Sequence, residues 1–148
     1  MIEVFKLDKN AKTPTRNNHT DVGVDIYSLQ DVFIPIGQTK IIKTGVCIKI
    51  PEGFVGKIED RSSLAAKGLR TGAGVIDPGY SGEVGVVIHN FSAGPRRNPV
   101  LYENGYQISA GDKIAQLLLV PVDISSIIEV PELWNSERGN KSFGSSGK

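Results

Sequence analysis

Turn-forming residues recur at short intervals along this chain and divide it into short runs rich in apolar and β-branched side chains. Glycine supplies positive φ angles and proline presets φ, so each glycine- or proline-containing group marks a turn. Such groups stand at residues 35–37, 51–53, 77–79, 103–105 and 110–112. Between them, residues 46–50 alternate as a half-buried strand does, and residues 84–88 are almost wholly apolar. This pattern predicts an all-β sandwich or barrel.

Two runs refine that prediction. Residues 114–120 are apolar except for Gln116, are bounded by turns and are too few for an independent helix, so we expect a strand buried on both faces. Residues 63–67 are the one persuasive helix, about one turn long, with Ser63 as its N-terminal cap and Gly68 at its end.

Length and composition indicate one ordinary globular domain. The chain has 148 residues, of which 39% are hydrophobic and 22% charged, and it has no apolar run of about 18 residues. Its first residues carry charges and lack the features of a secretory signal, so we expect an intracellular, most simply cytoplasmic, protein without a membrane partner. A net charge of +1 gives no general attraction to nucleic acid, so we expect no nucleic-acid partner.

The segment GVIDPGYSGE, residues 74–83, places an acid, a tight turn and an aromatic ring between two β runs. Asp77 there has two interpretations: it caps its own turn, or it stays ionised beside an arginine and polarises a water molecule. Residues 60–63, DRSS, supply an arginine and two hydroxyls at the expected helix start. They too could be a helix cap or a phosphate site.

The last residues, 138–148, are rich in glycine and serine and should be flexible on their own. They are not a P-loop, because Gly144 is followed by Ser145 instead of Lys-Ser or Lys-Thr. The segment is therefore either a disordered terminus or a lid, in which Arg138 and Lys141 contact a triphosphate and Phe143 stacks on a ring.

Five segments, taken in this order and at these separations, resemble the trimeric dUTPase family across nearly the whole chain. They are DVGVDIYS (21–28), DRSSLA (60–65), GVIDPGYSGE (74–83), GDKIAQL (111–117) and RGNKSFGSSG (138–147). The resemblance implies an all-β, jelly-roll-like barrel with one short helix, a homotrimer with C-terminal arm exchange, and sites built from more than one chain. Residues 1–134 would form the β domain, and residues 135–148 would be a flexible arm that closes over a neighbouring subunit's site.

The same resemblance implies hydrolysis of dUTP to dUMP and pyrophosphate, which limits uracil incorporation into DNA and supplies dUMP for thymidylate synthesis. Asp77 matches the base that activates the water attacking the α-phosphorus, and Arg61 matches the residue that orients it. Tyr80 matches the ring under the deoxyribose, where a steric block to a 2′-hydroxyl discriminates better than an apolar pocket alone. Asp25 matches an aspartate that meets Mg²⁺ indirectly, through water.

In the family, main-chain groups of the hairpin leading into the third motif, here about residues 71–75, read the uracil edge. Gly72 and Gly74 suit a close backbone approach, and Val75 ends this segment. Ser62 and Gln116 match phosphate-contacting positions. The resemblance adds to the substrate site Ser63, Arg138, Phe143, Gly144, Ser145 and Ser146. The chain departs from the usual motifs at Val22 and Val24, and at Lys141 and Ser142, where the family commonly has two glycines.

Two alternatives accompany this hypothesis. A dCTP deaminase shares the Arg-Ser-Ser helix start and the Asp-Pro-Gly-aromatic hairpin, but it needs a glutamate at the position of Val87, and Glu83 lies too far along the expected strand to substitute. A dUTPase-like protein could also serve chiefly as a ligand-gated interaction module, in which nucleotide binding orders the tail.

Overall fold

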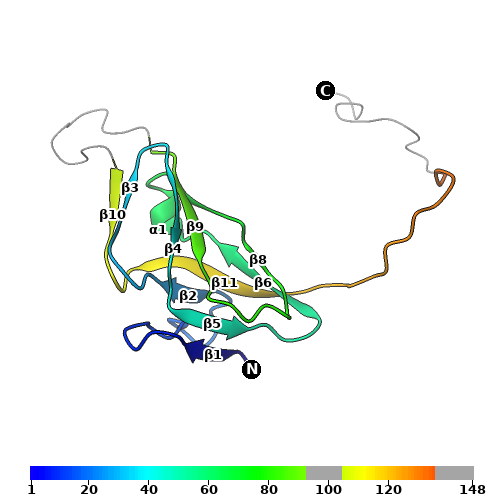
Figure 1. The fold of residues 1–148 in the computed structure, drawn as a ribbon, viewed down its shortest axis with the longest axis horizontal. Helices are drawn as coiled ribbons and strands as arrows, with labels where there is room; N and C mark the ends of the chain where they lie inside the picture. The colour runs from blue at the N-terminus through cyan, green and yellow to red at the C-terminus, as the bar shows by residue number, and fades with distance from the viewer. Residues whose placement is uncertain (93–104, 136–148) are drawn as a thin grey trace.

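The computed structural model describes residues 1–92 and 105–135, which form a β-rich body with an extended C-terminal end (Figure 1). Within this part of the chain there is a single short helix, so the predicted all-β class with one short helix is confirmed. The elements are β1 Glu3–Lys6, β2 Val24–Tyr27, β3 Val32–Pro35, β4 Thr39–Ile42, β5 Val46–Lys49, β6 Phe54–Glu59, α1 Ser62–Ala65, β7 Leu69–Gly72, β8 Val75–Ile76, β9 Val86–Asn90, β10 Gly105–Ile108 and β11 Lys113–Pro121.

The strands pair antiparallel in four groups. One sheet has the order β2-β11-β6-β8 and another the order β4-β9-β7, while β1 pairs with β5 and β10 with β3. Strand β11 lies between β2 and β6, which brings three of the sequence motifs to one place. Ile114, Ala115 and Leu117 are buried, but Val120 is 37% exposed, so the expected burial on both faces holds only for the first half of this strand.

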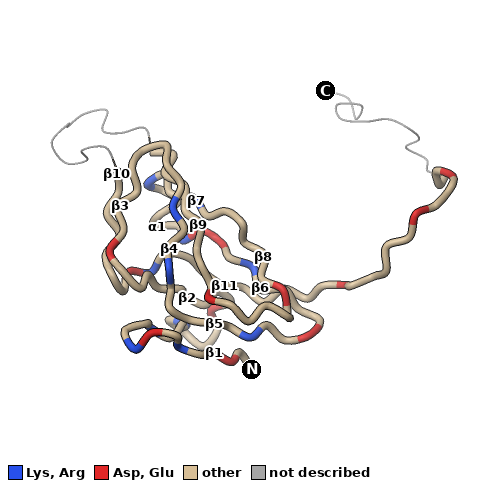
Figure 2. The backbone as a smooth tube through the Cα atoms, viewed as in Figure 1, with Lys and Arg blue, Asp and Glu red and all other residues tan. Residues whose placement is uncertain are grey.

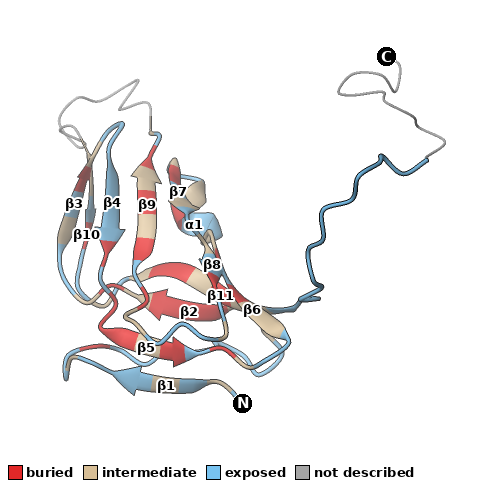
Figure 3. Cartoon of the chain, turned by 45° about the vertical axis from the view of Figure 1, so that its right-hand side comes forward, coloured by how far each residue is buried: buried red, intermediate tan, exposed pale blue. Residues whose placement is uncertain are grey.

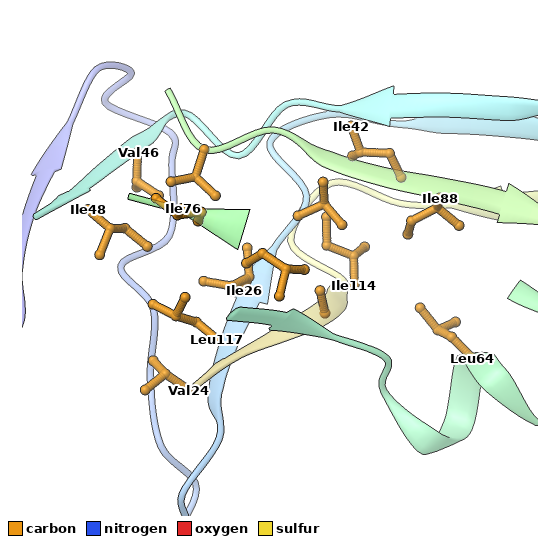
Figure 4. Packing of buried hydrophobic residues seen from close by; sticks show 14 of the residues in the cluster. Val24, Ile26, Ile42, Val46, Ile48, Leu64, Ile76, Ile88, Ile114 and Leu117 are labelled. Carbon is orange, nitrogen blue, oxygen red and sulfur yellow. The ribbon is translucent and has the colours of Figure 1, made fainter. Parts of the chain in front are cut away.

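The core is built largely from branched aliphatic side chains that the strands of different sheets direct inward (Figure 4). Buried and partly buried positions alternate along β9, where Val86, Ile88 and Asn90 are buried. This strand begins at Val86, two residues later than the apolar run suggested, and continues to Asn90. The residues that are almost fully buried include Ile26, Ile34, Ile42, Ile48, Ile88, Ile114 and Leu117.

The helix α1 differs from its prediction at its start. It begins at Ser62, Arg61 is the N-cap residue, and no side chain caps it, so the predicted cap by Ser63 is wrong. The first turn is closed instead by main-chain bonds, because the carbonyl of Arg61 accepts from the amides of Leu64 and Ala65. A helix this short depends on tertiary packing, which the buried Leu64 supplies.

Residues 122–134, here called the extended segment, run away from the body and are exposed throughout (Figures 1 and 3). Several of their side chains are large and apolar: Ile124 is 76% exposed, Ile127 100% and Trp134 73%.

Acidic and basic residues are interspersed along the body (Figure 2). No helix in the described residues is long and apolar enough to cross a membrane.

Candidate active site

A buried carboxylate between two cations lies where β2, β6 and β11 meet. Asp25 on β2 is 4% exposed. Its Oδ1 lies 3.2 Å from Nε of Arg61, and its Oδ2 lies 2.7 Å from Nζ of Lys113. Nε2 of Gln116 donates to the same Oδ1 over 3.5 Å, at the limit of a hydrogen bond. We call these four residues the Asp25 centre.

Strand register explains why these residues meet. Gln116 of β11 is paired with Asp25 on one side and with Glu59, two residues before Arg61, on the other. The first, second and fourth motifs therefore converge through a single strand. Gly23 leaves room for this arrangement, because a Cβ at that position would lie 3.0 Å from Cδ of Gln116.

The Asp25 centre is suited to bind an anion. One carboxylate faces two cations, so the group keeps a net positive charge that can attract phosphate oxygens. Ser62 and Ser63 come directly after Arg61 in the sequence and are exposed. Neither hydroxyl has a hydrogen-bond partner among the residues that the structure describes. Both hydroxyls are therefore available to a ligand.

Asp77 belongs to a second group, at a small cavity of about 160 Å³. Its side chain is exposed and, within residues 1–92 and 105–135, has neither a hydrogen-bond nor an ion-pair partner. The turn is closed by its main chain, since the amide of Tyr80 donates to the Asp77 carbonyl over 3.0 Å. The interpretation that the Asp77 carboxylate caps its own turn is therefore wrong. The cavity is lined by Ile58, Ala73, Val75, Ile76, Asp77, Tyr80, Glu83, Val84 and Gly85.

Tyr80 lines this cavity. Its hydroxyl donates to the main-chain carbonyl of Glu83 over 2.7 Å, and the residue is 46% exposed. Gly82 lets the ring pack closely, because a Cβ there would lie 2.7 Å from the Tyr80 hydroxyl oxygen and the ring would have to shift. The ring is thus fixed by its own turn and still presents a surface to a ligand.

Residues 71–75, here called the base-reading segment after the role that the family resemblance implies, connect β7 to β8. We expected a hairpin, but β7 pairs with β9 and β8 pairs with β6, so the two strands belong to different sheets. Gly74 is packed tightly, because a Cβ there would lie 2.6 Å from the carbonyl oxygen of Ile58. Gly72 has no such constraint, since its nearest neighbour, a side-chain carbon of Val87, would lie at an ordinary 3.7 Å. Gly74 is therefore required by the packing of this chain, whereas Gly72 is not.

Among the described residues, no ion pair joins Asp77 to the Asp25 centre. Arg61 has Asp25 as its ion-pair partner, whereas the structure gives Asp77 no partner among the described residues, so the expected contact from Arg61 to Asp77 is not formed inside one chain. The expected tail contacts lie outside the described residues; these are Arg138, Phe143, Gly144, Ser145 and Ser146.

Sequence reasoning gave no role to two residues that the structure makes prominent. Lys113 stands inside the GDKIAQL motif, but its approach to Asp25 depends on how β11 pairs with β2. Asp60 was considered only as part of a helix cap. Its Oδ1 accepts from the main-chain amide of Thr71 at 2.6 Å and from the Thr71 hydroxyl at 2.8 Å, and its Oδ2 pairs with Nε of Arg70 at 2.5 Å.

Comparison with known proteins places this chain in a family. A family model described as dUTPase matches residues 9–147. The deoxyuridine 5'-triphosphate nucleotidohydrolase of Kluyveromyces lactis is 41% identical over 149 residues, covering 99% of this chain and 94% of that protein. The structure of Staphylococcus bacteriophage 80alpha dUTPase with dUPNHPP has a TM-score of 0.84 at 35% identity, covering 100% of this chain and 99% of that chain.

A mutant dUTPase from phage phi11 of S. aureus, whose structure describes the coordination of a structural Mg(II) ion, gives a TM-score of 0.80 at 34% identity. That match covers 91% of this chain and 99% of that chain. The chain belongs to the dUTPase family. The jelly-roll-like β fold expected from the five motifs is therefore confirmed.

Proposed function

We propose that this chain hydrolyses dUTP to dUMP and pyrophosphate, with Asp77 as the base that activates the attacking water. The exposed Asp77 carboxylate carries this proposal, because it has no structural partner among the described residues and lies beside Tyr80 at a cavity. The turn itself is closed by the main chain and does not use this carboxylate. The identity of the substrate, dUTP, is inferred from membership of the dUTPase family.

In the proposed mechanism, Asp77 takes a proton from water as the water oxygen attacks the α-phosphorus. A positioned general base contributes about 10²–10⁴-fold to the rate. The positive charge of Arg61 and Lys113 beside Asp25 would face the phosphates, together with the hydroxyls of Ser62 and Ser63. In the tail, Arg138, Ser145 and Ser146 would meet the terminal phosphates, and Phe143 would cover the base.

We further propose that the complete site forms between chains of a homotrimer. This would let Arg61 of one chain approach Asp77 of another, which fits the separation of the two groups within one chain. Large apolar side chains are exposed on the body, including Ile41 at 71% and Phe91 at 65%, and the extended segment adds more. Such surfaces are typical of interfaces. The extended segment would be exchanged, and residues 135–148 would close over a neighbouring site.

Magnesium fits this site as an ion carried by the substrate. The described residues hold no group of three or more His, Cys, Asp or Glu side chains that could cage a metal. Mg²⁺ typically keeps several waters and is held by one or two carboxylates plus substrate phosphates. Asp25 would contact it only through water, since both of its oxygens already face cations. When bound, the ion would neutralise charge on the triphosphate and on the departing pyrophosphate.

The positions needed for deamination argue against the dCTP alternative. Val87 lies on β9 opposite Ile41 and Gly72, and its side chain cannot transfer a proton. Glu83 does not lie on that strand, contrary to our expectation, because β9 begins only at Val86. Its Oε1 accepts from the amide of Gly45 over 2.8 Å, which ties Glu83 to the connection between β4 and β5. Hydrolysis therefore remains the better-supported reaction.

The variant Asp77→Asn tests the proposed base, because it keeps the shape of the side chain while removing its ability to take a proton. We expect dUTP hydrolysis to fall by about 10²–10⁴-fold, while binding of dUTP, measured by calorimetry, is retained. The matched control is Ser81→Ala, an exposed position of the same turn that we give no role. Hydrolysis at the unaltered rate in Asp77→Asn would contradict the mechanism, and tight binding without turnover in the unaltered chain would favour the interaction-module alternative.

A further inference from the structure

Asp60 lies at the junction between the two candidate groups and connects two sheets. It follows β6 directly, precedes Arg61 of the Asp25 centre, and its side chain is only 20% exposed. Its carboxylate reaches Arg70 and Thr71 on β7, which belongs to the other sheet. We call these three residues the Asp60 clamp.

The clamp is strong because it satisfies both carboxylate oxygens with three donors. Oδ1 accepts from the amide and the hydroxyl of Thr71, at 2.6 and 2.8 Å, and Oδ2 pairs with Nε of Arg70. Burial raises the pKa of Asp60, but the hydrogen bonds from Thr71 and the charge of Arg70 outweigh this effect and hold the pKa below its ordinary value. The carboxylate is therefore ionised at neutral pH, which favours charge-assisted bonds.

The base-reading segment, residues 71–75, is held at its start by Asp60, the residue after β6, and near its end by Ile58 of β6. At its start, the Thr71 amide is bound by Asp60. Near its end, the Gly74 carbonyl accepts from the amide of Ile58 over 2.8 Å. Between these ties Ala73 has a φ of 49°, a conformation that non-glycine residues rarely adopt and that needs support from its surroundings.

We propose that Asp60 is a positioning residue that sets base selectivity, by fixing the main chain at the start of the base-reading segment. This inference rests on the proposed function, in which main-chain groups of residues 71–75 read the base edge. Uracil and cytosine reverse a donor and an acceptor there, so fixed groups leave a wrong base unpaired. If the segment loosens, its peptide groups can shift toward the wrong base, and discrimination falls.

The test compares kcat/KM for dUTP and dCTP in the full chain, with dCTP measured both as substrate and as competitive inhibitor. Asp60→Ala removes all three bonds, and we expect the dUTP-to-dCTP ratio to fall at least tenfold, mainly through a higher KM for dUTP. Asp60→Asn retains an acceptor for Thr71 and should restore most of the ratio. Arg70→Gln removes the ion pair but leaves both Thr71 bonds, so its ratio should fall much less than that of Asp60→Ala.

A ratio in Asp60→Ala equal to that of the unaltered chain, even with a lowered melting temperature, would show a purely structural role and overturn the proposal. If Asp60→Ala does not fold, Thr71→Val decides, because it removes one bond of the clamp. Its ratio should fall about threefold, and no fall would overturn the proposal. Failure of the unaltered chain to hydrolyse dUTP, or to prefer it over dCTP, would instead refute the proposed function.

Discussion

Asp25 and Asp77 have opposite surroundings, although both are aspartates of the candidate site. Asp25 is buried between Arg61 and Lys113, and its carboxylate forms ion pairs that hold both cations in place. Asp77 is exposed and has no partner among the described residues, so its charge remains available to a water molecule. The environment of each carboxylate, more than its residue type, indicates its role.

Gly74 supports the base-reading segment through close packing, which Gly74→Ala tests. The added Cβ would lie 2.6 Å from the carbonyl oxygen of Ile58, so β8 must shift away from β6. We expect a loss of about 1–3 kcal/mol in the free energy of unfolding, measured by denaturant titration. Gly79→Ala is the control, since nothing lies within 4 Å of its Cβ and its φ is not positive. Equal stabilities of the two variants would contradict this packing.

The Asp60 clamp should also appear in the acid stability of the protein. Because the folded-state pKa of Asp60 lies below its ordinary value of 3.8, the clamp stabilises the fold above that pH and is lost as pH falls through the folded pKa. The difference in unfolding free energy between the unaltered chain and Asp60→Asn should therefore be constant from pH 8 to about 5 and shrink below about pH 4. A difference that grew on acidification would contradict this sign.

At the scale of elements, β11 organises the site, because it pairs with β2 and β6 and so brings three motifs together. Asp25→Asn tests that convergence by leaving Arg61 and Lys113 without their counter-charge. We expect a loss of about 3 kcal/mol in unfolding free energy, since removing one partner of a buried ion pair leaves uncompensated charge.

The control is Glu3→Gln, which removes the ion pair to Lys49 on β5, where both side chains are more than half exposed. This change should cost less than about 1 kcal/mol. Both losses are measured by the same denaturant titration. A similar loss in the two variants would mean that the Asp25 centre does not hold the strands together.

Local sequence patterns predicted much of this arrangement. Glycine and proline turns marked most strands, and the order of the motifs indicated Asp25, Asp77 and Gln116. The role of Lys113 could not be predicted, because it depends on the register between β11 and β2, which involves residues far apart in the sequence. Asp60 was missed for the same reason, since its partners lie in another sheet.

At the scale of the whole molecule, the extended segment leaves large apolar side chains without cover in a single chain. Trp134 is the only tryptophan and is 73% exposed, so its fluorescence reports on assembly. If the homotrimer forms by exchange of this segment, light scattering should give three times the mass of one chain, and tryptophan emission should be blue-shifted.

Ile127→Asp, which places a charge at a position 100% exposed in one chain, should weaken the assembly and shift the emission to the red. An unchanged mass in Ile127→Asp would argue that this side chain is not buried between subunits. Monomeric mass for the unaltered chain would refute the homotrimer.

The central claim is that water activated by Asp77 attacks the α-phosphorus of dUTP, and isotope transfer tests it most directly. Turnover is carried out in oxygen-18 water, and the products are separated and analysed by mass spectrometry. We predict one labelled oxygen in dUMP and none in pyrophosphate. Label in pyrophosphate would contradict attack at the α-phosphorus.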